Sequence, residues 1–410
     1  MGHTGHASSS TDTQHPTDTG IRPAAGRVRQ TAAMSLLTWI AAGSLAAWLW
    51  LLLGQGLFWR TDIRLPPSEE PQTWPTVAIL VPARDEAEVL PLSLPTLLAQ
   101  DYPGRAEIFL VDDGSTDGTG ELAQQLAQTQ PHGLPLSVHS PGEPEAGWTG
   151  KLWAVRHGMS LARARTDTDF LLLTDADIAH APGSLRSLVS AALSARLDLV
   201  SQMARLRADS GWERLIVPAF VYFFAQLYPF GWVNRPAART AAAAGGCVLL
   251  RTEAAVRARL PESIRDAVID DVTLARAVKR VGGGRIWLGL ADGVTSVRPY
   301  ERLPQLWQMV ARSAYAQLGH NPLVLLGTVA GLALVYLVPP VTALAGSPVG
   351  AAAWAVMAVT YVPMLRYYRQ APWRALALPA TAALYLLMTL DSALRHHRGR
   401  GAAWKGRTYA

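Results

Sequence analysis

Phe170-Leu171-Leu172-Leu173-Thr174-Asp175-Ala176-Asp177 is the stretch that decides the fold of this chain. A continuous apolar run of this length, bounded by polar residues, predicts a fully buried strand of a parallel sheet. The two aspartates are one residue apart, and side chains at i and i+2 of an extended segment point the same way. Open α/β sheets bind ligands at the carboxyl ends of their strands, so the pair predicts a site for a hard cation that bridges a phosphate. The alternative is two solvated aspartates that cap the next helix.

Two similar strand signals lie N-terminal to this stretch. Residues 77–81 form a buried apolar run, which is followed by Pro82-Ala83-Arg84-Asp85-Glu86 and a leucine-rich helix near 88–99. Residues 107–111 form the next run, and a helix is predicted at 119–128. This alternation of strands and helices predicts an α/β domain with a parallel sheet over residues 76–300.

The second strand also ends in an acidic pair, Asp112 and Asp113. Carboxylates accept hydrogen bonds from a base imide and ribose hydroxyls, and the glycine that follows allows close approach of a nucleotide. A calcium loop is the competing interpretation, because Asp113, Ser115 and Asp117 match its opening positions. We reject it because the twelfth position is Gln124 rather than glutamate and because a strand precedes the loop.

Two further motifs carry candidate chemistry. Gly147-Trp148-Thr149-Gly150-Lys151 offers glycines for backbone approach and a lysine as a point charge for phosphate. Asp270 and Asp271 open the helical pattern that continues through Leu274 and Val278. A carboxylate at this position is either a helix cap or a general base that removes a proton from an acceptor hydroxyl.

Composition favours a membrane-bound protein. The chain has 410 residues, of which 50% are hydrophobic and 17% are charged, and its formal net charge is +6. No basic stripe interleaved with aromatics is present, so we expect no nucleic-acid partner, and arginines beside apolar segments are typical of membrane proteins. The single cysteine, Cys247, excludes an internal disulfide and a cysteine-based zinc site, and we interpret it as a small buried residue.

The N-terminal part divides into three regions. Residues 1–30 are rich in Ser, Thr, His, Gly and Pro and are predicted to be a disordered tail. Residues 31–59 are predicted to form a transmembrane helix, because about 20 apolar residues span a bilayer. Residues 60–320 then form the α/β domain. Its aromatic segment 213–232 is either a membrane-surface, acceptor-facing segment or a buried core helix.

Residues 321–391 contain three apolar runs and are predicted to be C-terminal membrane segments. The runs at 322–342 and 350–365 are long enough to span, whereas 375–390 is short. Arginines precede the third run and a basic tail at 392–410 follows it, which conflicts with the positive-inside rule if that run crosses the membrane. We therefore interpret 375–390 as re-entrant or interfacial.

Taken together, the motifs resemble a known family. VPARDE (81–86), VDDGSTD (111–117), GK (150–151), TDAD (174–177) and IDD (269–271), in this order, are similar to those of membrane-bound family 2 glycosyltransferases with the GT-A fold, a Rossmann-like nucleotide-diphospho-sugar transferase domain. More narrowly, GWTGKLWAV (147–155), LYPFGWVN (227–234) and WKGRTY (404–409) resemble the hopene-associated glycosyltransferases of bacterial hopanoid gene clusters.

The resemblance implies a role for each motif residue. The nucleotide-sugar binding set is expected to be Ala83, Glu86, Asp112, Asp113, Lys151, Asp175 and Arg312. Asp175 and Asp177 would bind Mg²⁺ or Mn²⁺ together with the diphosphate. Asp271 would be the catalytic base, with Asp270 in place of the family's usual glutamate.

Arg312 would correspond to the arginine of the family's QxxRW motif. The residues around it are Met309-Val310-Ala311-Arg312-Ser313, so both the glutamine and the tryptophan of that motif are missing. That tryptophan typifies processive polysaccharide synthases, and its absence therefore favours a one-step transfer.

The expected function is an inverting transfer of sugar from a UDP-sugar to a hydroxyl of a membrane lipid, a hopanoid or a related polycyclic lipid. The expected location is the bacterial inner membrane, crossed several times, with the catalytic domain facing the cytoplasm, where nucleotide sugars are made. The alternatives are a polyisoprenyl-phosphate sugar transferase, a polysaccharide synthase, and a membrane-tethered nucleotide-binding protein without catalysis.

Overall fold

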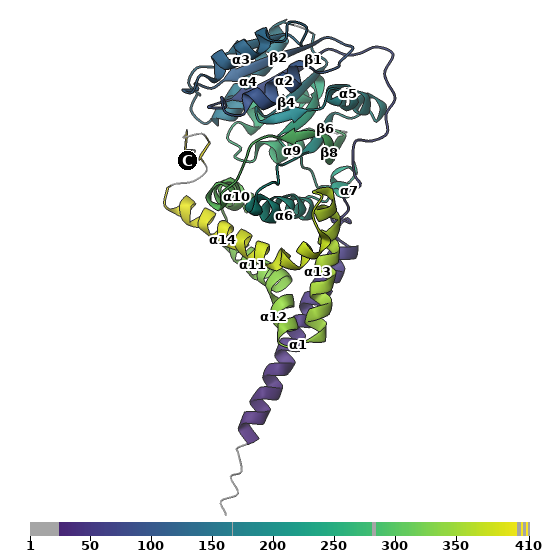
Figure 1. The fold of residues 1–410 in the computed structure, drawn as a ribbon, viewed down its shortest axis with the longest axis vertical. Coiled ribbons are helices and arrows are strands. Elements are labelled where there is room, and N and C mark those ends of the chain that lie inside the picture. The colour runs from purple at the N-terminus through teal and green to yellow at the C-terminus, as the bar shows by residue number, and fades with distance from the viewer. Residues whose placement is uncertain (1–23, 166, 281–283, 400–402, 405–406, 409–410) are drawn as a thin grey trace, which may run out of the picture.

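The computed structural model describes residues 24–165, 167–280, 284–399, 403–404 and 407–408. An α/β domain lies at one end of the molecule, and a stalk of helices projects from it (Figure 1). A layer of crosswise helices separates the two parts.

The domain is built on one eight-stranded sheet with the order β3-β2-β1-β4-β7-β6-β8-β5. Its strands are β1 (Val77–Ala83), β2 (Ala106–Asp112), β3 (Leu136–His139), β4 (Phe170–Thr174), β5 (Ile178–His180), β6 (Leu199–Arg205), β7 (Cys247–Arg251) and β8 (Ile286–Ser296). The strands predicted at 77–81, 107–111 and 170–174 are therefore confirmed. Every residue of β1 and β4 is buried, as expected for strands covered on both faces.

The predicted all-parallel sheet is only partly correct. Strands β3, β2, β1 and β4 are parallel, but β7 runs antiparallel to both β4 and β6, and β5 runs antiparallel to β8. The direction of β7 is set by the long excursion through the crosswise helices, after which the chain re-enters the sheet from the opposite end. The sequence of β7 contains no local pattern that predicts its antiparallel direction.

Helices cover both faces of the sheet. One buried cluster joins the sheet to α4 (Gly150–Arg165), α8 (Thr252–Arg257) and α9 (Asp270–Arg280). The other joins it to α2 (Leu90–Leu98), α3 (Thr119–Gln128) and α5 (Ser184–Ser194). The helices predicted near 88–99 and at 119–128 are confirmed as α2 and α3. The remaining short elements are η1 (Glu262–Ile264) and the antiparallel pair β9 (Ala403–Trp404) and β10 (Arg407–Thr408).

The stalk consists of α1 (Ala24–Leu53), α11 (Pro322–Leu332), the π-helical segment η2 (Ala333–Leu337), α12 (Val338–Leu344) and α13 (Pro348–Tyr367) (Figure 1). Trp48 is fully buried, and its indole Nε1 donates to Val335 O at 2.6 Å, so α1 is held at the level of η2. Large apolar side chains on the outside, such as Trp39, Leu323 and Leu344, are more than half exposed. An apolar exterior of this kind is typical of a lipid-facing surface.

Among the described residues, five segments are long and apolar enough to cross a membrane by length and composition: Leu36–Leu53, Gly211–Val233, Pro322–Leu344, Pro348–Tyr367 and Pro372–His397. Helix α1 begins at Ala24, and residues 1–23 of the predicted tail 1–30 lie outside the described residues. At the other end, the helix continues to His397, into the predicted tail 392–410.

The crosswise layer contains α6 (Gly211–Leu227), α7 (Phe230–Val233), α10 (Leu303–Gln317), η3 (Pro372–Ala377) and α14 (Leu378–His397). Helices α6, α10 and α14 lie across the direction of α1 and α13, directly below the domain (Figure 1). α14 packs against both α10 and α6. Residues 375–390 thus lie in this layer, within Pro372–His397, which is also one of the candidate spans.

Segment 213–232 is largely a core helix. Tyr222 is fully buried, with its ring centroid 5.0 Å from that of Tyr361 and 5.1 Å from that of Phe58. Its hydroxyl lies 2.7 Å from Thr360 Oγ1. Of the two interpretations of this segment, these contacts favour the buried core helix, because α13 and α14 pack against the aromatic face of α6.

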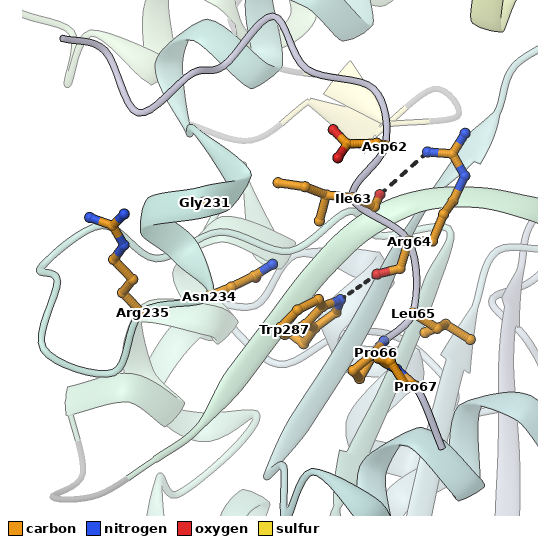
Figure 2. Close-up of a pocket in the computed structure, with 10 residues that line it drawn as sticks. All are labelled: Asp62, Ile63, Arg64, Leu65, Pro66, Pro67, Gly231, Asn234, Arg235 and Trp287. Carbon is orange, nitrogen blue, oxygen red and sulfur yellow. Dashed lines mark hydrogen bonds between the residues drawn. The ribbon is translucent and has the colours of Figure 1, made fainter. Parts of the chain in front are cut away.

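The connection from α1 to β1 is docked on the domain rather than loose. The Trp287 indole of β8 donates to Arg64 O at 2.7 Å. The linker residues 62–67 line a shallow cavity together with Gly231 of α7 and Asn234 and Arg235, which follow α7 (Figure 2). Arg64 also lies over the Tyr367 ring, 5.1 Å from its centroid. The linker thus ties the domain to the end of α13.

Candidate active site

The predicted site residues gather at the carboxyl ends of β1, β2 and β4. Ala83 and Asp112 are register partners at the ends of β1 and β2, and Asp113 N donates to Ala83 O at 2.9 Å. Because β4 is parallel to β1, Asp175, which directly follows β4, reaches the same edge. Parallel pairing therefore brings together residues that are about 90 positions apart in the chain.

The loops after β1 and β2 hold each other. Asp112 Oδ1 accepts from Ser115 N at 2.8 Å, and Ala87 N donates to Asp117 Oδ2 at 3.0 Å. Asp113 is fully buried, with Arg84 Nη1 3.6 Å from its Oδ2. The carboxylates of Asp112 and Asp117 thus accept from main-chain N–H groups, which holds the two loops in place. A Cβ at Gly120 would lie 3.0 Å from Asp112 Oδ2, so glycine is required there.

Because β7 is antiparallel, the glycine turn that precedes it lies at the carboxyl ends of β1, β2 and β4. Cys247, the first residue of β7, pairs with Thr174, the last residue of β4. The preceding Gly245 and Gly246 therefore lie next to Asp175. Thr174 Oγ1 donates to Gly246 O at 2.9 Å, and Gly245 N donates to Asp271 Oδ2 at 2.9 Å. Cys247 is buried, as predicted.

Lys151, Asp175, Asp270 and Asp271 line one pocket, and we call them the lysine cluster. Lys151 Nζ lies 2.9 Å from Asp175 Oδ1 and 3.2 Å from Asp270 Oδ2. Both carboxylates raise the pKa of Lys151 against the effect of burial, so its ammonium stays charged.

Asp271 and the adjacent Asp270 have different hydrogen-bond and ion-pair partners. Its Oδ1 accepts from its neighbour Val272 N at 2.7 Å and its Oδ2 from Gly245 N, so the main chain orients the carboxylate. Burial and the charge of Asp270 raise the pKa of Asp271 to about 6, in spite of the opposing effect of Lys151. A carboxylate with this pKa is a stronger base than an ordinary aspartate and is still ionised at neutral pH.

A second group, Arg298 with Glu86, Asp177 and Ser296, lies on the other side of Asp175, and we call it the arginine cluster. Arg298 Nε lies 3.1 Å from Asp177 Oδ2, and Nη2 of the same guanidinium donates to Glu86 Oε2. Ser296 Oγ donates to Asp177 Oδ2 at 3.0 Å. Asp177 and Asp175 are thus held by different cations.

Arg312 lies exposed on α10, near enough for its charge to act on Asp175. Burial raises the pKa of Asp175, but Lys151 first, and then Arg312 and Arg298, lower it below its usual value. The structure therefore brings Arg312 toward the site even though its motif lacks the family's glutamine and tryptophan.

The two aspartates retain capacity for a divalent ion. Lys151 engages Oδ1 of Asp175 and Arg298 engages Oδ2 of Asp177, and no hydrogen bond reaches the other oxygen of either carboxylate within the described part of the chain. In the same part there is no group of three or more His, Cys, Asp or Glu side chains placed to hold a metal. Two carboxylate oxygens with a diphosphate and water suit Mg²⁺ or Mn²⁺, which keep several non-protein ligands.

Arg298, Ser296 and the buried His180 lie at the site but outside the residues predicted from the sequence. His180 Nε2 lies 2.9 Å from Thr174 Oγ1, and burial lowers the pKa of His180 to about 4, so the ring is neutral. Because Thr174 gives its proton to Gly246 O, it accepts from His180. Arg298 follows β8, a strand whose pattern was not recognised, and only that strand end could have pointed to it.

Comparison with known proteins agrees with this geometry. Residues 78–255 match the family described as "Glycosyl transferase family 2". A beta-monoglucosyldiacylglycerol synthase from Synechocystis sp. is 30% identical over 185 residues, covering 40% of this chain and 36% of that protein. A polyprenol monophosphomannose synthase from Mycolicibacterium smegmatis is 34% identical over 115 residues, covering 28% and 39% respectively. The chain thus spans less than two fifths of the length of these relatives.

Among solved structures, a mannosyltransferase from Pyrobaculum calidifontis in complex with GDP-Man and Mn²⁺ is similar with a TM-score of 0.52 and 21% identity. The alignment covers 87% of this chain and 99% of that one. The class is therefore a GT-A fold, as predicted. Within that class, residues 78–255 are similar to family 2 glycosyltransferases.

Proposed function

We propose that this protein is an inverting glycosyltransferase that moves a sugar from a nucleoside-diphosphate donor, a UDP-sugar, to a hydroxyl of a membrane lipid. The observation that carries the proposal is the lysine cluster, in which an oriented carboxylate of raised pKa, Asp271, lies beside an acidic strand end. Asp271 would remove a proton on one side of this cluster, and the acidic strand end would bind the diphosphate on the other side.

The donor would lie along the edge formed by β1, β2 and β4. Ala83, Glu86, Asp112 and Asp113 would hold the nucleoside, with Asp112 and Asp113 on the base and ribose. Asp175 and Asp177 would hold a divalent ion, which when bound supplies positive charge to the leaving diphosphate. Lys151 and Arg312 would stabilise the same charge as it develops.

Asp271 would take the proton from the acceptor hydroxyl as that oxygen attacks the anomeric carbon. The oxygen–carbon bond forms on the face opposite the departing diphosphate, so the anomeric centre inverts and no covalent enzyme intermediate is needed. Asp270 keeps Lys151 close, 3.2 Å away, and raises the basicity of Asp271.

A lipid acceptor is supported by the architecture. The candidate spans and the crosswise helices α6, α10 and α14 lie on one side of the domain (Figure 1). A lipid hydroxyl at the bilayer surface would therefore meet the domain without leaving the membrane. We propose a bacterial inner-membrane location with the domain facing the cytoplasm, and a hopanoid or related polycyclic lipid as acceptor.

A polyprenyl phosphate is the second candidate acceptor. It is favoured by the similarity to a polyprenol monophosphomannose synthase. Both acceptors would use the same donor site. A phosphate oxygen is already ionised at neutral pH and needs no base, so only a hydroxyl acceptor would depend on proton removal by Asp271.

The test is nucleoside-diphosphate release by the purified full chain in detergent. UDP- and GDP-sugars are offered with Mn²⁺ or Mg²⁺, with and without a hopanoid fraction or a polyprenyl phosphate. We expect EDTA-sensitive release that depends on one lipid class, whose glycosylated product is then isolated. Nucleotide binding without turnover across all donors and lipids would favour the non-catalytic alternative.

A further inference from the structure

One guanidinium joins two carboxylates that the proposed function assigns to different ligands. Arg298 contacts Glu86, which follows β1 on the nucleoside side, and Asp177, which follows β4 on the metal side. The planar fork of arginine suits two separate carboxylates in a way that a lysine ammonium does not. The two halves of the donor site are thus connected by a residue outside every family motif in this chain.

All three side chains are shielded from water. The exposed fractions are 23% for Arg298, 15% for Asp177 and 9% for Glu86. Charges in such a setting are screened much less than surface charges. Since a guanidinium does not lose its proton in a protein, this positive charge is permanent.

The backbone that carries Arg298 is fixed on both sides. Val297 N donates to Asp177 O at 2.9 Å, and Tyr300 N donates to Glu213 Oε1 at 2.7 Å. Glu213 is itself fully buried and caps the start of α6. The Cα of Arg298 is therefore anchored, which holds its guanidinium between Glu86 and Asp177.

We propose that Arg298 is a positioning residue that acts as a built-in counter-cation of the donor site. It holds Glu86 and Asp177 together in the free protein, opposes binding of a divalent ion alone, and makes the ion and the nucleoside diphosphate bind together. An ion at Asp175 and Asp177 meets the positive charges of Arg298 and Lys151, and the diphosphate brings the negative charge that offsets them. This inference rests on the proposed function.

The test measures Mn²⁺ binding to the full chain in detergent by the electron paramagnetic resonance of the free ion, with and without UDP or GDP. Three variants are compared with the wild type. Arg298→Ala removes the positive charge. Arg298→Lys keeps the positive charge but lacks the planar guanidinium that contacts both carboxylates. Arg285→Ala is the matched control, since this exposed arginine precedes β8 at the opposite end of the same strand.

We expect wild type to bind Mn²⁺ at least tenfold more tightly when the nucleotide is present. Arg298→Ala should bind Mn²⁺ alone about tenfold more tightly than wild type, and the nucleotide should then add little. Arg298→Lys and Arg285→Ala should bind Mn²⁺ alone as weakly as wild type. Thermal unfolding of each variant establishes that it is folded.

Two results would overturn the inference. If folded Arg298→Ala binds Mn²⁺ alone as weakly as wild type or more weakly, Arg298 is not a counter-cation. The proposed sugar transfer would still stand, because it is assayed separately. Failure of UDP and GDP to bind the wild type would remove the proposed function and this inference together.

Discussion

Two adjacent aspartates have different chemical environments, although their side chains are identical. Asp270 pairs with Lys151 at 3.2 Å, whereas both oxygens of Asp271 accept from main-chain N–H groups. Neutral donors orient a carboxylate without removing as much of its basicity as an ion pair does. On this distinction rests our proposal that Asp271 removes the proton and that Asp270 has a supporting role.

The first prediction is that Asp271→Asn lowers the transfer rate by about 10²- to 10⁴-fold, the usual contribution of a general base. Donor binding should persist, because the nucleoside side of the site is untouched. The measurement is nucleotide release together with calorimetric binding of the nucleoside diphosphate. Wild-type turnover by folded Asp271→Asn would assign the base to another residue.

The second prediction concerns pH. Asp271 must be deprotonated to act as a base and its pKa is raised to about 6, so the rate should be full at neutral pH and fall as pH drops through 6. Asp270→Asn removes the negative charge that raises this pKa, so the acidic limb should move to lower pH. A pH profile of the single-turnover rate for both proteins measures the shift. An unchanged or upward-shifted limb would contradict it.

At the scale of elements, the direction of β7 decides whether a site exists. Because β7 runs antiparallel to β4, it begins where β4 ends, and Gly245 then reaches Asp271. A parallel β7 would place its glycines at the opposite edge of the sheet. The base is thus oriented by a strand reversal rather than by its own helix alone.

The contact between α6 and α13 also matters for the site, because α6 joins the domain to the stalk of candidate spans. The third prediction is that Tyr222→Ala destabilises the protein by about 3–5 kcal/mol, the range for truncating a large buried aromatic side chain. Tyr222→Phe, which loses only the hydrogen bond to Thr360, should cost about 1 kcal/mol.

Thermal unfolding in detergent measures both changes. Leu227→Ala is the matched control on the same helix, since Leu227 is 58% exposed. An equal loss of stability in Tyr222→Ala and Leu227→Ala would contradict the buried interface.

At the scale of the molecule, the domain, the crosswise layer and the stalk are stacked in that order (Figure 1). If α12 and α13 cross the bilayer, the turn between them lies on the side opposite the domain. The segment between α13 and η3 would then lie on the domain side, where Arg366, Arg369 and Arg374 satisfy the positive-inside rule.

The fourth prediction uses the single buried cysteine, Cys247, which leaves an introduced cysteine as the accessible thiol. In intact cells, Ala345→Cys should react with a membrane-impermeant maleimide. Ala371→Cys should react only after the membrane is opened. Both alanines are exposed, so unequal labelling reports the side of the membrane. The reverse pattern would place the domain outside.

The sequence by itself determined the buried strands β1, β2 and β4 and the acidic residues at their ends. Those signals are local, because an apolar run between polar residues predicts a buried strand wherever it lies. It also determined the helix that Asp270 and Asp271 open and the two apolar runs that became η2 with its flanking helices and α13. The family resemblance pointed to the GT-A fold through the same short motifs.

Only the tertiary structure decided which carboxylates share a cation and that β7 is antiparallel to its neighbours. Arg298 meets Glu86 and Asp177 across 212 and 121 residues, and such pairing depends on sheet order rather than on any local pattern. The burial of α6 was likewise undecided, since an aromatic helix looks the same in sequence whether lipid or protein covers it. Packing against α13 and α14 settles that, because only the folded chain determines which surface lies next to it.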